Sequence, residues 1–276
     1  MKKIKLVLFA TVCFSTASIG QTNTFLKLST GKTYQVDNKV ETNSTTEIQG
    51  QSMESKFNVA STYKIEVKGK TGNNYNLTNT LSHIVMDMDV MSQQINFDSD
   101  KKEDMDGQMG EGLKAFINQP KDLQIDNSGK IISKDSSDSS LSGVAQRLNL
   151  AQTGFGTQLA FVALPDNVKV GATWTDSSTT DGISRTTNYT IKSISGGIAD
   201  VAFTGTTTSD VKMEQNGMEI STKTKGKVAG EEKVDVKSGI IQSSTSTGDA
   251  SGTVSAMGQD FPATVKVTST TTVKEL

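Results

Sequence analysis

The strongest constraint on the fold of this chain is a pattern that occurs twice. Residues 26–34 and residues 168–174 both place an apolar-Lys-apolar triplet before a glycine and a Thr-aromatic pair, which ends at Tyr34 in one and Trp174 in the other. Three further matches follow in the same order: 63–65 with 189–191, 69–78 with 196–203, and 127–133 with 237–243. Four short matches in one order indicate two copies of one β unit. Residues 164–174 are then the start of the second copy.

Apolar and polar residues alternate along both copies, which predicts antiparallel strands. A period of two places one face of a strand against a core and the other in water. The face expected to be wet is rich in Thr, Ser, Asn and Lys, which suits solvated strands. In the second copy, Asn216-Gly217 predicts a hairpin turn. The residues expected on the buried face are Tyr34, Val36, Val40, Phe57, Val59, Tyr63, Ile65, Val67, Leu77, Leu81, Ile84, Met86, Met88 and Val90. A long last strand is indicated by Phe261, Val265, Val267 and Val273.

One segment, residues 139–163, has helical spacing and one broad apolar stripe. The stripe consists of Leu141, Val144, Ala145, Leu148, Ala151, Phe155, Leu159 and Val162. We expect Gly154 and Gly156 to break or bend this helix and Pro165 to end it. Its polar face carries a single charge, Arg147, whereas a membrane-surface helix would carry more basic residues. The helix is therefore expected to pack on the apolar face of a sheet.

A shorter segment, residues 109–117, also has helical spacing and is closed by Pro120. Together these patterns predict a mainly β protein with minor α content. Two repeated antiparallel β units would form a curved sheet, a partial barrel or a sandwich, with one or two amphipathic helices on its apolar face. We expect a first β unit over residues 21–135, a linker and helix over 136–166 and a second β unit over 167–276. The two units are either separate or parts of one continuous domain.

The first 20 residues have the features of a signal peptide. The positive end contains Lys2, Lys3 and Lys5. The apolar run over residues 6–17 is too short to span a bilayer comfortably, and small residues precede Gln21, where the mature chain would begin. The alternative is lipoprotein processing at Cys13, which the bulky Val12 beside it fits poorly. The sequence thus predicts an exported protein, periplasmic or secreted, with no transmembrane segment in the mature chain.

The charge balance argues against two classes of partner. The chain has 28 basic and 30 acidic residues, for a formal net charge of −2. Loss of a lysine-rich leader would make it more acidic. Nucleic acids and anionic membranes both require a basic surface, so we expect neither as a partner. Cys13 is the only cysteine, so a mature chain beginning at Gln21 would have no disulfide and no thiol nucleophile.

His83 is the only histidine, and this limits the catalytic devices that the chain could contain. A Ser-His-Asp or Cys-His device would have to use it, and no Gly-x-Ser-x-Gly elbow is present. A zinc site of several histidines is excluded by count. Its place in a predicted strand between Leu81 and Ile84 favours a structural histidine. Gly154 and Gly156 lack the third glycine of a dinucleotide fingerprint. We predict no catalytic residue, no cofactor and no enzymatic activity.

The methionines near His83 raise the possibility of a copper site, because thioethers bind Cu(I). They are Met86, Met88, Met91, Met105 and Met109. Met86 and Met88, however, share the predicted buried face with Ile84 and Val90, which is typical of core methionines. The pattern therefore favours packing over metal binding.

The weak metal candidates are acidic residues that follow the first group of strands. They are Asp98, Asp100, Asp104 and Asp106, with Glu111 nearby. Residues 104–107 resemble the middle of a calcium-binding EF-hand loop, but Lys102 and Leu113 occupy its first and closing ligand positions. A solvated acidic loop is the preferred interpretation, and no metal site is predicted with these residues.

The layout resembles a family of uncharacterised secreted β-rich proteins from Bacteroidetes, which have a leader and two similar β halves. The resemblance rests on the Pro-x-x-x-Val-Gly-x-x-Trp type stretch from Pro165 to Trp174, which here has one extra residue before the glycine, and on the Phe97-Asp98-Ser99 triplet. It covers most of the mature chain. It implies a curved sheet or partial barrel, loosely similar in architecture to periplasmic lipid or lipoprotein carriers, and it supplies no catalytic residues.

Three functional hypotheses of different classes follow. The first is a non-enzymatic binding module of the cell envelope, with an apolar or lipid-like ligand inside the curved sheet and the helix over it. The second is a structural or protein-interaction role, with an envelope protein bound at a sheet edge or on the Thr/Ser-rich strand faces. The third and least favoured is a carboxylate-based hydrolase, because no nucleophile and histidine set supports it.

Overall fold

The computed structural model describes residues 24–48, 50–90, 93–134, 155–180, 182–215, 218–256 and 258–276. The expected signal peptide, Cys13, the Asn216-Gly217 turn and most of the helix expected over residues 139–163 lie outside the described residues. Within the described residues, no helix has the length and apolar character needed to span a membrane.

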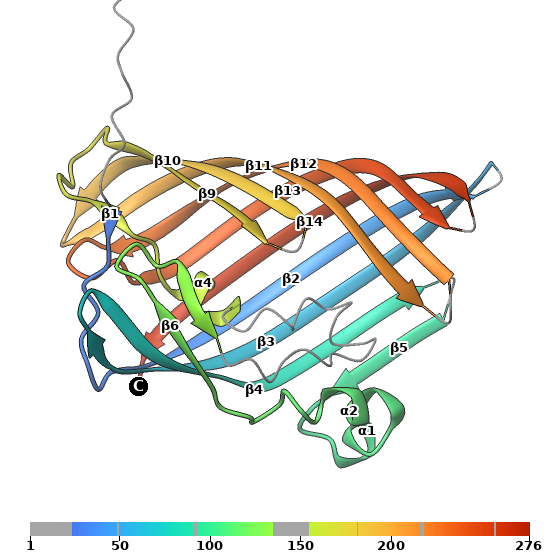
Figure 1. Cartoon of the computed structure of the whole chain (residues 1–276), viewed down its shortest axis with the longest axis horizontal. Helices are drawn as coiled ribbons and strands as arrows, with labels where there is room; N and C mark the ends of the chain where they lie inside the picture. The colour runs from blue at the N-terminus through green and yellow to red at the C-terminus, as the bar shows by residue number, and fades with distance from the viewer. Residues whose placement is uncertain are drawn as a thin grey trace, which may run out of the picture.

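Long antiparallel strands make up most of the described chain (Figure 1). They are β1 (Thr24–Phe25), β2 (Thr33–Ile48), β3 (Gln51–Thr71), β4 (Asn74–Val90), β5 (Gln93–Asp98), β6 (Lys121–Ile125), β7 (Ile131–Lys134), β8 (Leu164–Pro165), β9 (Thr173–Thr180), β10 (Ile183–Ser195), β11 (Ile198–Gln215), β12 (Met218–Asp235), β13 (Ile241–Ala256) and β14 (Gln259–Glu275). The described helices are short: α1 (Lys102–Met105), α2 (Gln108–Leu113) and α4 (Phe155–Ala160). The prediction of a mainly β protein with minor α content is confirmed.

One large sheet contains nearly all the described strands. Its order is β7-β6-β4-β3-β2-β14-β13-β12-β11-β10-β9, with β5 also paired to β4. The pairs are antiparallel throughout. The first half of the chain meets the second where β2 pairs with β14, with Val36 opposite Val273. The sheet is therefore continuous across both units.

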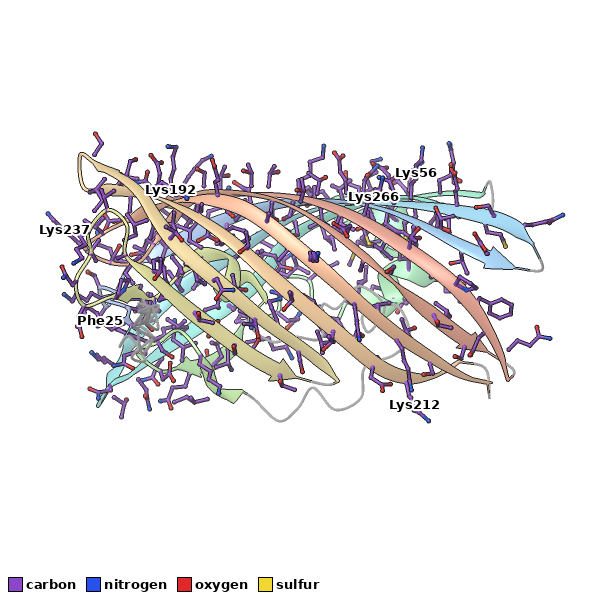
Figure 2. All side chains as sticks on the ribbon, turned by 90° about the horizontal axis from the view of Figure 1, so that it is seen from above. Phe25, Lys56, Lys192, Lys212, Lys237 and Lys266 are labelled. Atoms are coloured by element: carbon purple, nitrogen blue, oxygen red, sulfur yellow. The ribbon has the colours of Figure 1, made fainter. Side chains whose placement is uncertain are left out.

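The sheet curves around α4 and so has an inner and an outer face (Figure 1). Helix α4 contacts β4, β3 and β2 from the first unit and β13 from the second. A helix of six residues can reach strands so far apart in the sheet order because the sheet folds around it. Lys56 and Lys266 stand on the outer face (Figure 2). Of the shapes that the sequence allowed, the structure has a single strongly curved sheet.

Glycines on the inner face of β11 and β12 permit this curvature. A Cβ atom at Gly226 would lie 2.8 Å from the carbonyl oxygen of Asp249 on β13, and one at Gly205 would lie 2.9 Å from the carbonyl oxygen of Thr186 on β10. Real side chains do not tolerate such contacts with backbone, so these strands bend as closely as they do only without a Cβ atom.

The two copies predicted from the sequence recur in the structure. The first copy gives the strand order β2-β3-β4-β6-β7, and the second gives β9-β10-β11-β12-β13. Gly31 and Gly171 precede the first strand of each copy with φ of 81° and 85°. Their backbone N–H groups donate to the carbonyl oxygens of Val67 and Ile191. The copies therefore begin with the same turn, and β14 is an additional strand that joins the second copy to the first.

The structure corrects one detail of the sequence match. We aligned residues 63–65 with 189–191, but Tyr34 lies opposite Ile65 while Trp174 lies opposite Tyr189. Ile65 is thus the counterpart of Tyr189, and the match is shifted by two residues. An alternating strand looks similar after a shift of two, because the same face is retained. Only the hydrogen-bond register distinguishes the two alignments.

A β-bulge explains why the apolar positions of β4 change from odd to even numbers. Thr62 lies opposite His83, but the next residue, Tyr63, lies opposite Leu81. Ser82 is therefore the extra residue, and its hydroxyl donates to the carbonyl oxygen of Thr62. The bulge reverses the alternation, so that Leu81 and Ile84 are both buried on the inner face.

The helix predictions are only partly correct. Of the segment expected over residues 139–163, the described part is helical only in α4, which ends at Ala160 rather than at Pro165. Phe161 instead forms an antiparallel bridge with Ile240. Gly156 was expected to break the helix, yet it lies inside α4, where a Cβ atom would be 2.6 Å from Cγ of Tyr63. The glycine lets the helix approach β3 closely.

The shorter predicted helix is also reduced in length. Helix α2 begins at Gln108 and ends at Leu113, so it covers only the first part of residues 109–117, while Ile117 forms a parallel bridge with Leu81. Both Leu113 and Ile117 are buried, as their helical spacing predicted. The C-terminal end of the segment is not helical, because the backbone of Ile117 pairs with Leu81 on β4 instead.

The buried side chains form two clusters, one centred on each copy. Tyr34 is 2% exposed in the first and Trp174 is 6% exposed in the second. The prediction that these aromatic residues are matching core positions is confirmed. Tyr34 meets the ring of Phe161 edge to face, with centroids 5.9 Å apart. The segment after α4 is thus tied to the first copy as well as to the second.

Candidate functional site

The inner face has a packed end and an open end. At the packed end, α4 and the segment after it cover residues such as Val36, Ile65 and Ile84, which are fully buried. Farther along the same strands, the described apolar side chains on this face are only half-buried. They are Val40, Met53, Phe57, Met88, Phe203, Val211, Val228, Val254, Phe261, Val265 and Val267. We call this surface the trough.

Cross-strand pairing shows that the trough is continuous. Phe57 lies opposite Met88 on one side and Thr42 on the other, and Thr42 lies opposite Val267. The row continues through Gly248 to Val228. At the other end Met88 meets Ile95, which is 40% exposed. Such a row of half-covered apolar side chains is unusual on the surface of a folded chain and marks a place where something apolar can bind.

A polar row separates the packed end from the trough. Asn38, Ser61 and Thr271 are buried there. Oδ1 of Asn38 accepts hydrogen bonds from Oγ of Ser269 at 3.2 Å and from Oγ1 of Thr271 at 3.0 Å. Because these groups satisfy one another, the row is stable without a ligand.

Glu232 extends this polar row into the second unit. It lies between Val201 on β11 and Ser244 on β13, and on its own strand it shares the inner face with Val234, which is fully buried. Its Oε2 atom is shielded from solvent and has no hydrogen-bond partner among the described residues. Burial raises the pKa of Glu232 to about 7, against the opposing effect of a hydrogen bond from Ser244.

Glu232 stands apart from every other charged residue of the inner face. Among the described side chains of β2, β3, β4 and β11 to β14, Glu232 is the charged residue of that face that is not exposed, whereas Lys70 and Glu275 are exposed at its rim. Asp176 and Arg185 also point inward but are exposed near the β9 edge. The sequence analysis missed Glu232. The sequence feature that could have identified it is the alternation of side chains along β12: Glu231 and Lys233 face outward, so Glu232 between them faces inward.

Two of the four weak metal candidates come together with the only histidine. Nε2 of His83 lies 3.0 Å from Oδ1 of Asp98 and 3.6 Å from Oδ2 of Asp100. The backbone N–H of Asp100 and then His83 lower the pKa of Asp98 by hydrogen bonding to its carboxylate. These three groups offer ligand atoms within 4.8 Å of one another. The hydrogen bonds among these three residues also stabilise the turn between β5 and α1, which gives the residues a structural role.

The other two acidic candidates have partners elsewhere. Oδ2 of Asp104 accepts a hydrogen bond of 2.8 Å from the backbone N–H of Asp98, which fixes the start of α1 against β5. Asp106 forms an ion pair with Lys102. The four carboxylates therefore do not converge on one point as a calcium loop would require.

Of the methionines considered for copper, three are packed in or against the core, whereas Met88, which was expected to be a core residue, is only half-buried in the trough. Met86 is fully buried, and Met105 and Met109 pack against the same core. Met91 lies outside the described residues.

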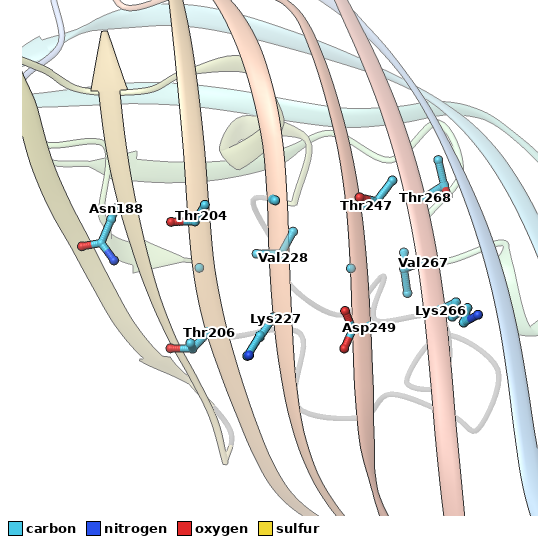
Figure 3. A pocket seen from close by; sticks show the side chains of 13 residues that line it. Asn188, Thr204, Thr206, Lys227, Val228, Thr247, Asp249, Lys266, Val267 and Thr268 are labelled. Carbon is cyan, nitrogen blue, oxygen red and sulfur yellow. The ribbon is translucent and has the colours of Figure 1, made fainter. Parts of the chain in front are cut away.

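The outer face carries a shallow hollow of about 630 Å³ that crosses β10 to β14 (Figure 3). Its side chains are mainly exposed and polar, including Thr206, Lys227, Asp249 and Lys266. Because it lies on the opposite face from the trough and lacks a buried polar group, it is an open surface rather than a built binding site.

The chain matches the model of a family of unknown function, DUF6263, over residues 72–160 and again over residues 156–241. The chain belongs to the DUF6263 family. The model matches as two repeated segments, which begin near the start of β4 and within α4 rather than at the start of the two copies described above. A search of curated proteins found no match.

Among solved structures, lipovitellin has a similar fold. The likeness has a TM-score of 0.50 and 13% identity, over 90% of this chain and 25% of that chain. This DUF6263 chain thus spans a quarter of that chain, and the likeness concerns the fold alone. An outer membrane channel from Pseudomonas putida F1 is also similar over 91% of this chain and 98% of that chain, with 8% identity, but its TM-score of 0.23 supports no argument.

Proposed function

We propose that this DUF6263 protein is a non-enzymatic binding module for an apolar or lipid-like ligand. The observation that carries the proposal is the trough, where apolar side chains from seven strands remain half-buried on the inner face beyond α4. On the opposite face of the same strands the side chains are polar or charged and exposed, such as Lys56 and Asn58 on β3.

The shape of the trough suits an extended hydrocarbon chain. From Met53 to Phe57 the inner side chains of β3 form a line, and at about 3.3 Å per residue it is roughly 13 Å long. Covering apolar surface contributes roughly 25 cal/mol per Å². A ligand that covers several of these side chains would therefore gain several kcal/mol without any charged contact.

The fold of lipovitellin supports the same ligand class. The similar structure was determined to describe lipid–protein interactions in lipovitellin. A curved sheet with an apolar inner face can hold an apolar ligand, and the described strands of this chain form such a sheet.

Two expectations from the sequence belong to the proposal. The first is that the protein is not an enzyme, since His83, Asp98 and Asp100 are explained by the turn that they stabilise. The second is that the chain is exported to the periplasm or secreted. Cell fractionation with the N-terminal sequence of the mature protein tests the second, and finding the intact leader in the cytoplasm would contradict it.

Native mass spectrometry of the protein purified from its own host tests the ligand class. We expect added mass that solvent extraction releases as lipid. An apolar fluorescent probe, N-phenyl-1-naphthylamine, should bind the delipidated protein and be displaced by that extract. Co-purification of a protein partner without lipid, together with no probe binding, would support the interaction role instead.

A matched pair of variants locates the site. Phe57→Asp places a charge in the trough, and Asn58→Asp places the same charge on the exposed face of the same strand. We expect the first to weaken probe binding by about 10-fold or more, a change of at least ~1.4 kcal/mol, and the second to leave it unchanged. Equal effects in two folded variants would place the probe elsewhere.

A further inference from the structure

The inner face combines an apolar trough with one buried acid at its packed end. Glu232 has an oxygen that is shielded from solvent and accepts no hydrogen bond from the described residues. A buried polar atom without a partner costs about 1–3 kcal/mol, and such an atom is unusual enough to require an explanation. The explanation we favour is that a ligand group supplies the missing partner.

The route from the trough to Glu232 passes over a glycine. Gly230 precedes Glu232 on the inner face of β12, and the ring of Phe203 lies over it, since a Cβ atom at Gly230 would be 2.5 Å from Cζ of that ring. Phe203 is itself half-buried and faces the trough. The ring of Phe203 therefore lies on the inner face beside Glu232, on the side of the trough.

We infer that Glu232 is the head-group site of the trough, and that its ligand is an amphiphile whose head donates hydrogen bonds and carries no negative charge. This inference rests on the proposed function, because it assumes that the tail lies in the trough. Long-chain amines and long-chain alcohols have the required chemistry. Long-chain carboxylates would place a second negative charge beside Glu232.

The charges that face this site agree with that class of ligand. Tyr189 is the nearest titratable neighbour on β10, and burial together with the charge of Glu232 raises its pKa, so it is neutral near pH 7. From β13 the facing group is the hydroxyl of Ser244, which carries no charge. Arg185 and Asp176 lie farther toward the exposed edge and are open to solvent. A ligand ammonium group beside Glu232 would therefore supply a positive charge that Tyr189 and Ser244 do not.

The same geometry gives a pH dependence. The raised pKa of Glu232, about 7, means that the acid is largely protonated at pH 6 and largely ionised at pH 8. A long-chain amine remains protonated over this range, so its affinity should rise as the carboxylate forms. The affinity of a long-chain alcohol should change much less.

Competition against N-phenyl-1-naphthylamine on the full chain tests the inference, with dodecylamine, dodecanol and dodecanoate as ligands of equal tail length. At pH 8 we expect dodecylamine to bind about 10-fold or more tightly than dodecanoate, or ~1.4 kcal/mol, and to bind more weakly at pH 6. Glu232→Gln should abolish this preference and its pH dependence while probe binding remains. Glu231→Gln, on the exposed face of the same strand, is the control and should behave as the unaltered protein.

The outcomes separate this inference from the proposed function. If the probe binds but the three ligands compete equally at both pH values, the head-group role of Glu232 is wrong and the apolar trough stands. If Glu232→Gln keeps the preference, the head-group site is elsewhere. If neither the probe nor any ligand binds, both proposals fail. Because the pH series uses the unaltered protein, the result does not depend on whether Glu232→Gln folds.

Discussion

The ring of Trp174 stacks on the ring of Tyr189, with centroids 5.0 Å apart and planes 11° apart. The pair joins β9, the edge strand of the sheet, to β10, and Tyr189 continues the contact to Phe203 at 5.9 Å. The edge of the second unit is thus held by aromatic packing that leads directly to Phe203, whose ring lies over Gly230 next to Glu232 on the inner face. In the first unit the corresponding pair is Tyr34 and Ile65.

Trp174→Ala should destabilise the whole protein by about 3–5 kcal/mol, the usual loss for a buried tryptophan. Because β14 pairs with β2, we expect both units to unfold in one transition rather than the second alone. Urea denaturation followed by circular dichroism measures this. Thr175→Ala, at the exposed neighbouring position, should change stability by less than ~0.5 kcal/mol. Two separate transitions would contradict the shared sheet.

Gly239→Ala should be more destabilising than Gly171→Ala. Both glycines have positive φ, 79° and 85°, so both alanines pay for an unfavourable backbone. At Gly239 the new Cβ atom would also lie 2.5 Å from the carbonyl oxygen of Val162 and 2.7 Å from Cδ2 of Leu26, whereas Gly171 has nothing within 4 Å. The difference should be about 1–3 kcal/mol. Equal melting temperatures of the two variants would show that the loop relaxes freely.

Gly156→Ala tests the seat of α4 on β3. A Cβ atom there would lie 2.6 Å from Cγ of Tyr63, which is itself buried, so the helix must lift away. We expect a loss of about 1–3 kcal/mol, although alanine is the better helix former. Gln158→Ala, exposed on the same helix, should be neutral or slightly stabilising. A stabilised Gly156→Ala protein would mean that α4 is not packed against Tyr63.

Stability should fall as the pH rises through the range set by Glu232. Its pKa is raised from 4.5 to about 7 in the folded protein, so the folded state holds the proton more tightly than the unfolded state. The stabilising effect is complete below pH 4.5 and is lost as the pH rises to about 7, with a magnitude of about 3 kcal/mol. Urea unfolding at pH 5 and pH 8 should show this slope, and Glu232→Gln should remove it.

Two other carboxylates do not interfere in that window. Hydrogen bonds from the backbone of Asp100 and from His83 lower the pKa of Asp98, and those from Lys233 and Ser193 lower that of Asp200. A lowered pKa adds stability that is lost only as the pH falls below about 4. A slope between pH 5 and pH 8 that persists in Glu232→Gln would therefore have another origin.

Much of the first copy could be predicted because its strands have one packed face. The positions of Tyr34, Val36 and Ile65 followed from a period of two, and all three are buried on the inner face. The bulge at Ser82 was visible only as a change of phase between Leu81 and Ile84, which the sequence alone did not explain. The prediction that the helix ends at Pro165 was wrong, because Leu164 and Pro165 form β8, and its pairing with β1 competes with helix formation there.

The candidate site was far less predictable. Asp98, Asp100, Asp104 and Asp106 drew attention because they are close in sequence, yet only the first two meet, through a turn that also brings in His83. Glu232 has no sequence neighbour that suggests a site. Its surroundings come from Val201 and Ser244 on adjacent strands and from Phe203 across a glycine.

The sequence by itself determined the class of structure: two copies of an antiparallel β unit, each with one apolar face, joined through the stretch that ends at Trp174. That information is local, because the alternation of side chains depends only on neighbouring residues. Only the tertiary structure decided that the copies share one sheet through β2 and β14, that this sheet curves around α4, and that Glu232 faces inward with an Oε2 atom that has no partner among the described residues. These features depend on curvature and register, which arise from contacts between residues far apart in the chain.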